Sequence, residues 1–171
     1  VKIPGIFETA KDVYDIPLKA SGNSSPVMVP AKGRYMMVDD LPRFAKLYDV
    51  PLNNNPHFPI NTLNLMRGAV ALLDGEYFET YIDAVFNAIW VDSKNMANIE
   101  TVSEVLSSAG LNPQAILTST QSPDVKETLI TNTGKAVERG LFGAPTMFMD
   151  GEMFFGQDRL QFVEAALQQK S

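Results

Sequence analysis

One stretch near the end of the chain decides the fold, and it reads GLFGAPTMFMDGEMFFGQDR over residues 140–159. Two short apolar runs flank Asp150-Gly151 within it. Asp-Gly between apolar runs is typical of a tight β-hairpin, because both central residues of such a turn need a positive φ. The stretch therefore predicts a strand, a two-residue turn and a second strand.

A proline bend and a helix start border this predicted hairpin. Pro145 has no N–H and restricts Ala144 to extended geometry, so the backbone of Ala144 is left free to face a ligand. After the second strand, Gly156-Gln157-Asp158 precedes a predicted helix over residues 159–169. The first N–H groups of a helix are unpaired and carry a partial positive charge, which favours an anion there.

The composition excludes several classes of function. The 171 residues are 45% hydrophobic, enough for a sizeable core in one domain with an insertion. A net charge of −6 without a dense Lys/Arg cluster argues against nucleic-acid binding. No apolar run approaches the roughly 18 residues that span a bilayer, and no signal peptide is evident, so we expect no membrane partner. The chain has no cysteine and a single histidine, which excludes disulfides, thiol exchange and a His-rich metal centre.

The middle of the chain has the apolar spacing of helices. Helices are predicted over residues 39–48, 61–73, 76–92, 98–109, 113–120 and 124–139. Asp39 or Asp40 is expected to cap the first of them. Met66, Phe86 and Trp90 either line a pocket for an aromatic substrate or pack in the core, and their helical spacing favours the core.

The chain would then consist of a short strand end within residues 1–7, a helical block, and a strand-turn-strand-helix unit, and this order resembles the DsbA family. The resemblance is closest to its glutathione-using branch, the kappa-class glutathione transferases and the 2-hydroxychromene-2-carboxylate isomerases. In that branch the residue before a cis-proline pairs its backbone with the cysteinyl part of glutathione, and a Gly-(Ser/Gln)-Asp-Arg element binds the γ-glutamyl end. The matching positions here are Ala144-Pro145 and Gly156-Gln157-Asp158-Arg159.

Two further motifs extend the resemblance towards the start of the chain. Asn23 follows Ser-Gly, and Lys32 lies in VPAKGRYM, residues 29–36. The resemblance implies that both residues contact glutathione. An amide pairs with a peptide backbone and an ammonium offsets a carboxylate, which fits those roles. Without the resemblance, an Asx turn at Asn23 and a solvated side chain at Lys32 are the simpler interpretations.

A proline-punctuated loop, NPHFP over residues 55–59, also matches the isomerases. It is either a wall of the second-substrate pocket or a rigid connector to the next helix. His57 has a pKa range suited to a general base. It has no serine or carboxylate partner at a recognisable spacing, so we assign it no catalytic role.

The resemblance implies an α/β, thioredoxin-like fold with an inserted all-helical subdomain. Residues 1–38 would form a partial N-terminal portion with the glutathione-contacting loop, residues 39–122 the insertion, and residues 123–171 the C-terminal half. The family opens with a strand and a Ser-Pro-Tyr motif whose serine activates the thiol, and nothing in this chain matches them. The start at Val1 favours loss of that strand and helix, and leaves the catalytic residue unknown.

The resemblance also implies a function. The expected activity is a glutathione-dependent isomerisation of 2-hydroxychromene-2-carboxylate to trans-o-hydroxybenzylidenepyruvate, a step of aromatic compound catabolism. The alternatives are a kappa-class glutathione transferase or peroxidase, and a non-catalytic glutathione-binding module. Gln157, where kappa enzymes usually carry serine, favours the isomerase. The expected partners are glutathione and a small aromatic carboxylate, in a homodimer of the bacterial cytoplasm or, in a eukaryote, of an organelle.

Overall fold

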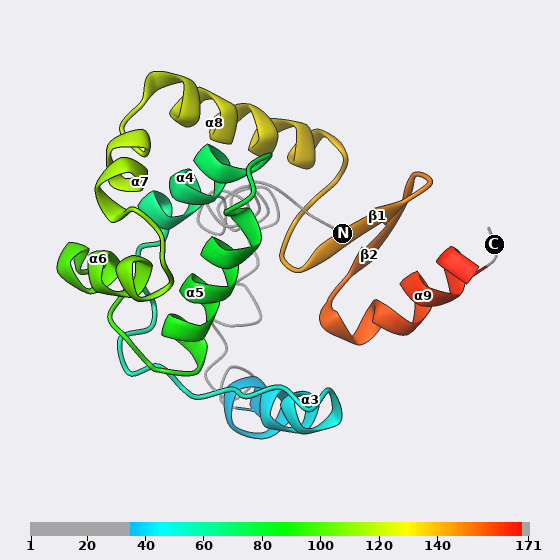
Figure 1. Ribbon diagram of the computed structural model, residues 1–171. Helices are drawn as coiled ribbons and strands as arrows, with labels where there is room; N and C mark the ends of the chain where they lie inside the picture. Colours follow the sequence, from blue (N-terminus) through cyan, green and yellow to red (C-terminus); the bar gives the residue numbers. More distant parts are fainter. Residues whose placement is uncertain (1–34, 169–171) are drawn as a thin grey trace, which may run out of the picture.

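The computed structural model of the chain describes residues 35–168 (Figure 1). The elements in chain order are η2 (Tyr35–Asp40), α3 (Leu41–Leu47), α4 (Leu63–Leu72), α5 (Phe78–Trp90), α6 (Ile99–Ser108), α7 (Pro113–Ser119), α8 (Pro123–Glu138), β1 (Thr146–Met149), β2 (Glu152–Phe155), η3 (Gln157–Arg159) and α9 (Leu160–Gln168). The strand end expected at residues 1–7 lies outside the described residues. The described residues form a fold dominated by helices, with a small two-stranded sheet.

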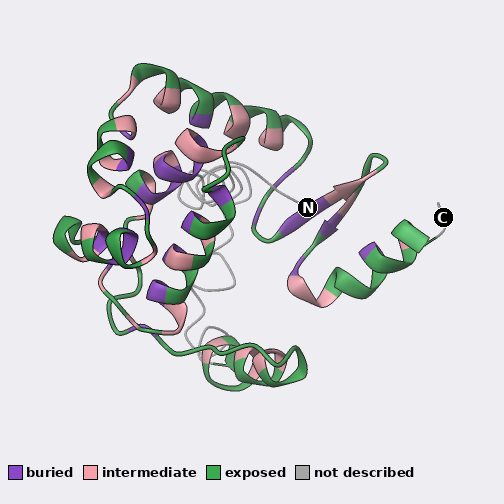
Figure 2. Cartoon of the chain, viewed as in Figure 1, coloured by how far each residue is buried: buried purple, intermediate pink, exposed green. Residues whose placement is uncertain are grey.

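The main core lies among α4, α5, α6, α7 and α8, with α4 packed against α5, α7 and α8 (Figure 1). Helices α4, α5 and α6 each bury several residues on the side that faces this core, whereas α7 and α8 bury Ile116 and Leu129, as Figure 2 shows in purple. The buried residues of this cluster are Leu65, Met66, Ala69, Val70, Phe78, Tyr81, Val85, Ala88, Ile89, Met96, Val102, Val105, Leu106, Leu111, Ile116 and Leu129.

The prediction that Met66, Phe86 and Trp90 pack in the core holds for only part of the set. Met66 is buried, and Trp90 packs half-buried against the cluster. Phe86 is 40% exposed, so the prediction was wrong for this side chain. At about 100° per residue, Phe86 lies at the edge of the stripe that centres on Val85 and Ile89, where α5 meets solvent.

The expected cap at Asp39 or Asp40 was also wrong. The chain before α3 is already helical, because Tyr35–Asp40 form the π-helix η2 and Asp40 has helical φ and ψ without a side-chain capping bond. A capping side chain needs an extended backbone and unpaired N–H groups ahead of it. Those conditions are met at Asn98 and Asn112, whose Oδ1 atoms accept from the N–H groups of residues 101 and 115 at 2.9 and 3.1 Å.

The predicted hairpin is confirmed. Strands β1 and β2 pair antiparallel, with Thr146 opposite Phe155 and Met149 opposite Glu152. Asp150 and Gly151 form the turn with φ of 51° and 86°, as a tight hairpin requires. One face of the hairpin packs on α9 through Met147, Phe154 and Val163.

The end of α8 supports the other side of the hairpin. Leu141, just after α8, packs with Ala136, Val137 and Phe148. The guanidinium carbon of Arg139 lies 3.8 Å from the centroid of the Phe148 ring, a cation–π contact. The hairpin therefore lies between α8 and α9 (Figure 1), which fixes the bend before β1 and the turn after β2.

We expect Gly68→Ala to lower the free energy of unfolding by about 2 kcal/mol, because overpacking a tight core contact costs on that scale. A Cβ at Gly68 would overlap the Tyr81 ring and hydroxyl, and that hydroxyl donates to the Leu65 carbonyl at 2.8 Å. Gly134→Ala is the matched control, since a Cβ in the middle of α8 meets no atom within 4 Å. Urea denaturation should show the control slightly stabilised. Equal stability of the two variants would contradict this account of the α4–α5 contact.

Alkaline pH is expected to destabilise the fold through Tyr81. Burial raises the pKa of the Tyr81 phenol above its ordinary value of 10.0. The folded chain therefore holds this proton while the unfolded chain releases it, so the stabilisation is complete below pH 10 and is lost as the pH rises above it. Urea denaturation at about pH 8 and about pH 11 should show a larger loss for the unaltered chain than for Tyr81→Phe. Equal losses would contradict the role of Tyr81.

Candidate functional site

The hairpin register brings the proline bend next to the turn after β2. Thr146 pairs with Phe155 at the end of the sheet. The next residue on each side continues this pairing, because the Gly156 N–H donates to the Pro145 carbonyl at 2.9 Å. The Ala144–Pro145 peptide is cis, and both residues are exposed. Behind the bend, the buried Thr146 hydroxyl donates to the Gly143 carbonyl at 2.6 Å. The exposed Ala144-Pro145 bend is therefore held next to Gly156 by this backbone hydrogen bond.

Asp158 lies in the single turn of η3 that leads directly into α9. Its Oδ2 is 2.6 Å from Nη1 of Arg159, and the two side chains are 42% and 47% exposed. Gly156 permits this arrangement, because a Cβ there would lie 2.5 Å from Oδ1 of Asp158. The carboxylate is thus open to solvent on one side, where it can accept hydrogen bonds from a ligand cation.

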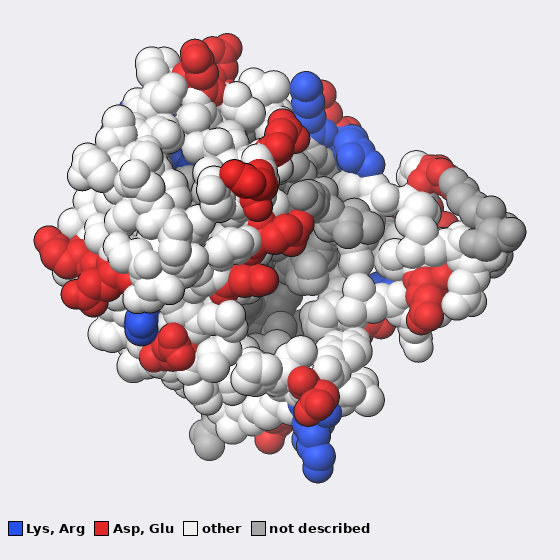
Figure 3. All heavy atoms as spheres, in the orientation of Figure 1, with Lys and Arg blue, Asp and Glu red and all other residues white. Residues whose placement is uncertain are grey.

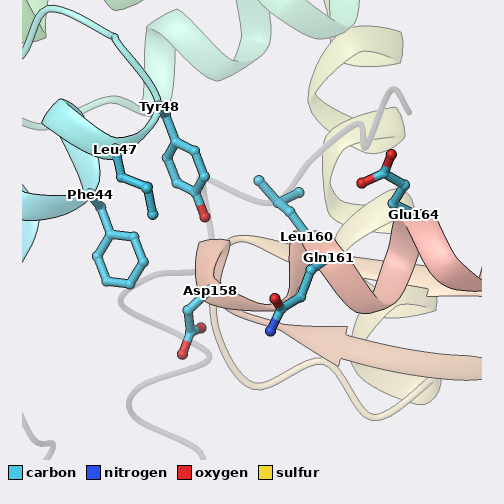
Figure 4. Close-up of a pocket in the computed structure, with 7 residues that line it drawn as sticks. All are labelled: Phe44, Leu47, Tyr48, Asp158, Leu160, Gln161 and Glu164. Atoms are coloured by element: carbon cyan, nitrogen blue, oxygen red, sulfur yellow. The ribbon is translucent and has the colours of Figure 1, made fainter.

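A pocket of about 450 Å³ separates Asp158 from α3. Its described lining residues are Phe44, Leu47, Tyr48, Asp158, Leu160, Gln161 and Glu164. Figure 4 shows Phe44, Leu47 and Tyr48 on one side of it, and Asp158, Leu160 and Gln161 on the other side, from the turn and the start of α9. The Tyr48 hydroxyl spans the two sides and donates to the Gln157 carbonyl at 3.0 Å. Aromatic and aliphatic walls beside carboxylates suit a ligand that carries an ammonium group.

The predicted site residues fall into two groups. The structure brings Ala144, Pro145, Gln157 and Asp158 to one end of the hairpin. Asn23 and Lys32 lie outside the described residues, so their contacts with glutathione stay predictions. Tyr48 was missed by the sequence analysis. It lies 109 residues from Gln157 in the chain, and no local pattern signals a contact at that separation.

The NPHFP loop is fastened to the C-terminal end of α5. The buried Asn55 amide donates to the carbonyls of Ile89 and Lys94 at 2.8 and 3.0 Å, and its Oδ1 accepts from the His57 N–H at 2.8 Å. The Phe58 ring lies 5.7 Å from that of Trp90, and the Phe58–Pro59 peptide is cis. His57 and Phe58 remain exposed, so the loop is anchored but presents side chains outward, and its role as a substrate wall stays a prediction.

The wider surface and the helices add three observations. Acidic side chains are scattered over the face in Figure 3, whereas basic ones are sparse there. Within residues 35–168, no three His, Asp or Glu side chains converge on a possible metal position. None of the helices in that described range has the length and apolar character needed to cross a bilayer.

The sequence is similar to known proteins over most of its length. Residues 12–168 match the family of DSBA-like thioredoxin domains. The chain is 30% identical over 167 residues to glutathione S-transferase kappa 1 of Rattus norvegicus, with 90% of this chain and 74% of the relative covered. It is 32% identical over 154 residues to 2-hydroxychromene-2-carboxylate isomerase of Sphingobium xenophagum, with coverages of 86% and 75%.

A solved structure agrees with these relatives. A solved structure of a 2-hydroxychromene-2-carboxylate isomerase superposes on this chain with a TM-score of 0.80 at 28% sequence identity. The match covers 93% of this chain and 76% of that one. The relatives named in these comparisons are enzymes, and the solved isomerase shares the overall fold of this chain.

Proposed function

This chain belongs to the DSBA-like thioredoxin domain family, and from that premise we propose that it is a glutathione-dependent isomerase of aromatic compound catabolism. The proposed reaction converts 2-hydroxychromene-2-carboxylate to trans-o-hydroxybenzylidenepyruvate. The observation that carries the proposal is the hydrogen bond between Gly156 and Pro145 in a chain without cysteine. It holds the exposed Ala144-Pro145 bend next to the accessible Asp158 carboxylate, a pairing that suits a peptide with a free ammonium group.

Glutathione would supply the thiol that this chain lacks. Its thiolate could add to a conjugated carbon, allow rotation about the former double bond, and leave again so that the double bond re-forms. The chain's own residues bind and orient. The Asp158 carboxylate accepts hydrogen bonds from the γ-glutamyl ammonium, and Gln157 with the first turn of α9 binds the neighbouring carboxylate. The backbone of Ala144 pairs with the cysteinyl part of the peptide. Asn23 and Lys32 bind its other end or the carboxylate of the aromatic substrate.

The test is an isomerisation assay of the full-length protein with and without glutathione, followed by the absorbance of substrate and product. We expect turnover only when glutathione is present, and an unchanged glutathione concentration at the end. Equal rates with and without glutathione would overturn the proposal.

A kappa-class glutathione transferase is the second candidate, favoured by the rat relative of that name. The same assay distinguishes the two, because a transferase consumes glutathione and forms a conjugate with an electrophilic aromatic compound. Glutathione binding without turnover of either kind would identify a non-catalytic binding module.

The family premise also supports a homodimer, in the bacterial cytoplasm or, in a eukaryote, in an organelle. Sedimentation equilibrium of the full-length protein measures the oligomeric state directly. A monomer at all concentrations up to those of the assay would contradict the dimer.

A further inference from the structure

The carbonyl of Gln157 is held by two donors from different parts of the chain. The Leu160 N–H donates to it from within the turn, and the Tyr48 hydroxyl donates to it from the end of α3 at 3.0 Å. A carbonyl oxygen has two lone pairs, so these two bonds use its full accepting capacity. The local bond closes the turn, whereas the bond from Tyr48 sets where the turn lies relative to α3.

Fixing this carbonyl also orients Asp158. The peptide group between Gln157 and Asp158 is planar, so the direction of its C=O sets the direction of the Asp158 N–H and limits the direction of the Asp158 side chain. The carboxylate lies beside the cationic Arg159, which attracts it at 2.6 Å. A second restraint on the backbone is therefore needed to keep the carboxylate facing the pocket between α3 and α9.

Tyr48 is well placed to provide that restraint. Its ring stacks on Phe44, with centroids 5.9 Å apart and the ring planes at 27°. Its own N–H donates to the Phe44 carbonyl at 2.9 Å, so the residue is fixed at the C-terminal end of α3. Both rings line the same pocket as Asp158, as Figure 4 shows.

We propose that Tyr48 is a positioning residue, which acts through the Gln157 carbonyl to hold the Asp158 carboxylate ready for the ammonium group of the γ-glutamyl moiety. The inference rests on the glutathione site proposed above and deepens it. It assigns to α3, in the helical part of the chain, a share of the binding of a ligand whose other contacts come from the hairpin end.

The first test is calorimetric titration of Tyr48→Phe with two ligands. The substitution removes only the hydroxyl and keeps the ring stack, so we expect the Kd for glutathione to rise about 3- to 10-fold, the worth of one hydrogen bond. Glutaryl-Cys-Gly lacks only the ammonium group, and its Kd should stay the same in the variant. A merely structural role for the hydroxyl would weaken both ligands equally, and that result would overturn the inference.

The control and a double-mutant cycle complete the experiment. Tyr77→Phe removes the hydroxyl of a half-exposed tyrosine next to α5, outside the described pocket lining, and should leave both affinities unchanged.

In an Asp158→Ala background, Tyr48→Phe should have no further effect, because the group that it positions is gone. Additive losses would overturn the inference. Failure of the unaltered protein to bind glutathione would overturn the proposed function and this inference together, whereas loss on Asp158→Ala without loss on Tyr48→Phe would overturn the inference alone.

Discussion

Replacing Asp158 with alanine is expected to raise the Kd for glutathione about tenfold. A hydrogen bond to a charged group contributes about 1.5–3 kcal/mol, and the exposure of this carboxylate together with its pairing to Arg159 places the effect at the lower end of that range. The ligand ammonium loses its only assigned anionic partner, while the contact of the peptide with Ala144 is kept. Binding should therefore weaken without being abolished.

Calorimetric titration measures this effect, and two variants control it. Asp158→Asn keeps the shape and removes the charge, so it should lose nearly as much affinity as alanine. Asp83→Ala removes an exposed carboxylate from α5 and changes the net charge equally, but it lies outside the described pocket lining and should bind as the unaltered protein does. Unchanged affinity in Asp158→Ala would show that the site is assigned wrongly.

The second large effect is expected at Gly156, which is buried and has φ of 104° and ψ of 149°. This region of backbone space is almost restricted to glycine, so Gly156→Ala should lower the free energy of unfolding by about 2 kcal/mol. The new Cβ would also lie 2.5 Å from Oδ1 of Asp158 and would force the carboxylate away. We therefore expect glutathione affinity to fall at least as far as in Asp158→Ala.

Gly151→Ala separates the effect of backbone strain from the effect of displacing the Asp158 carboxylate. Gly151 also has a positive φ, 86°, but a Cβ there meets no atom within 4 Å. That variant should lose about 1 kcal/mol of stability and keep its affinity for glutathione. Urea denaturation of Gly156→Ala and Gly151→Ala measures their stability. Calorimetric titration, at a temperature where both variants are folded, measures their affinity for glutathione. Full affinity in Gly156→Ala would mean that the orientation of Asp158 does not matter for binding.

The sequence predicts this fold best where the signal is local. Asp150-Gly151 specifies the hairpin because the turn geometry depends on those two residues alone, and the hairpin register then carries the bend to Gly156. The helices between residues 63 and 138 also follow from apolar spacing and lie within a few residues of their predicted ends. The presence of Pro145 and Asp158 at one end of a hairpin is therefore implied by a short stretch of chain.

The parts of the fold and of the site that the sequence does not predict depend mostly on contacts between distant segments. The bond from Tyr48 to Gln157 joins residues 109 apart, and the exposure of Phe86 depends on which helices surround α5. The failed cap at Asp40 has a local cause, because the residues directly before α3 are already helical as η2 and leave no N–H to cap. Spacing along one element carries no information about what packs against it from another part of the chain.

The central claim is that a chain without cysteine binds glutathione between the Ala144–Pro145 bend and the turn at Asp158. An NMR titration of the ¹⁵N-labelled protein with glutathione tests it most directly, since each amide reports its own surroundings. We predict saturable shifts concentrated at Ala144, Thr146 and residues 156–160, and about tenfold more glutathione should be needed for half-saturation in Asp158→Ala. Saturable shifts elsewhere with none at these two segments, or no shifts at all, would contradict the claim.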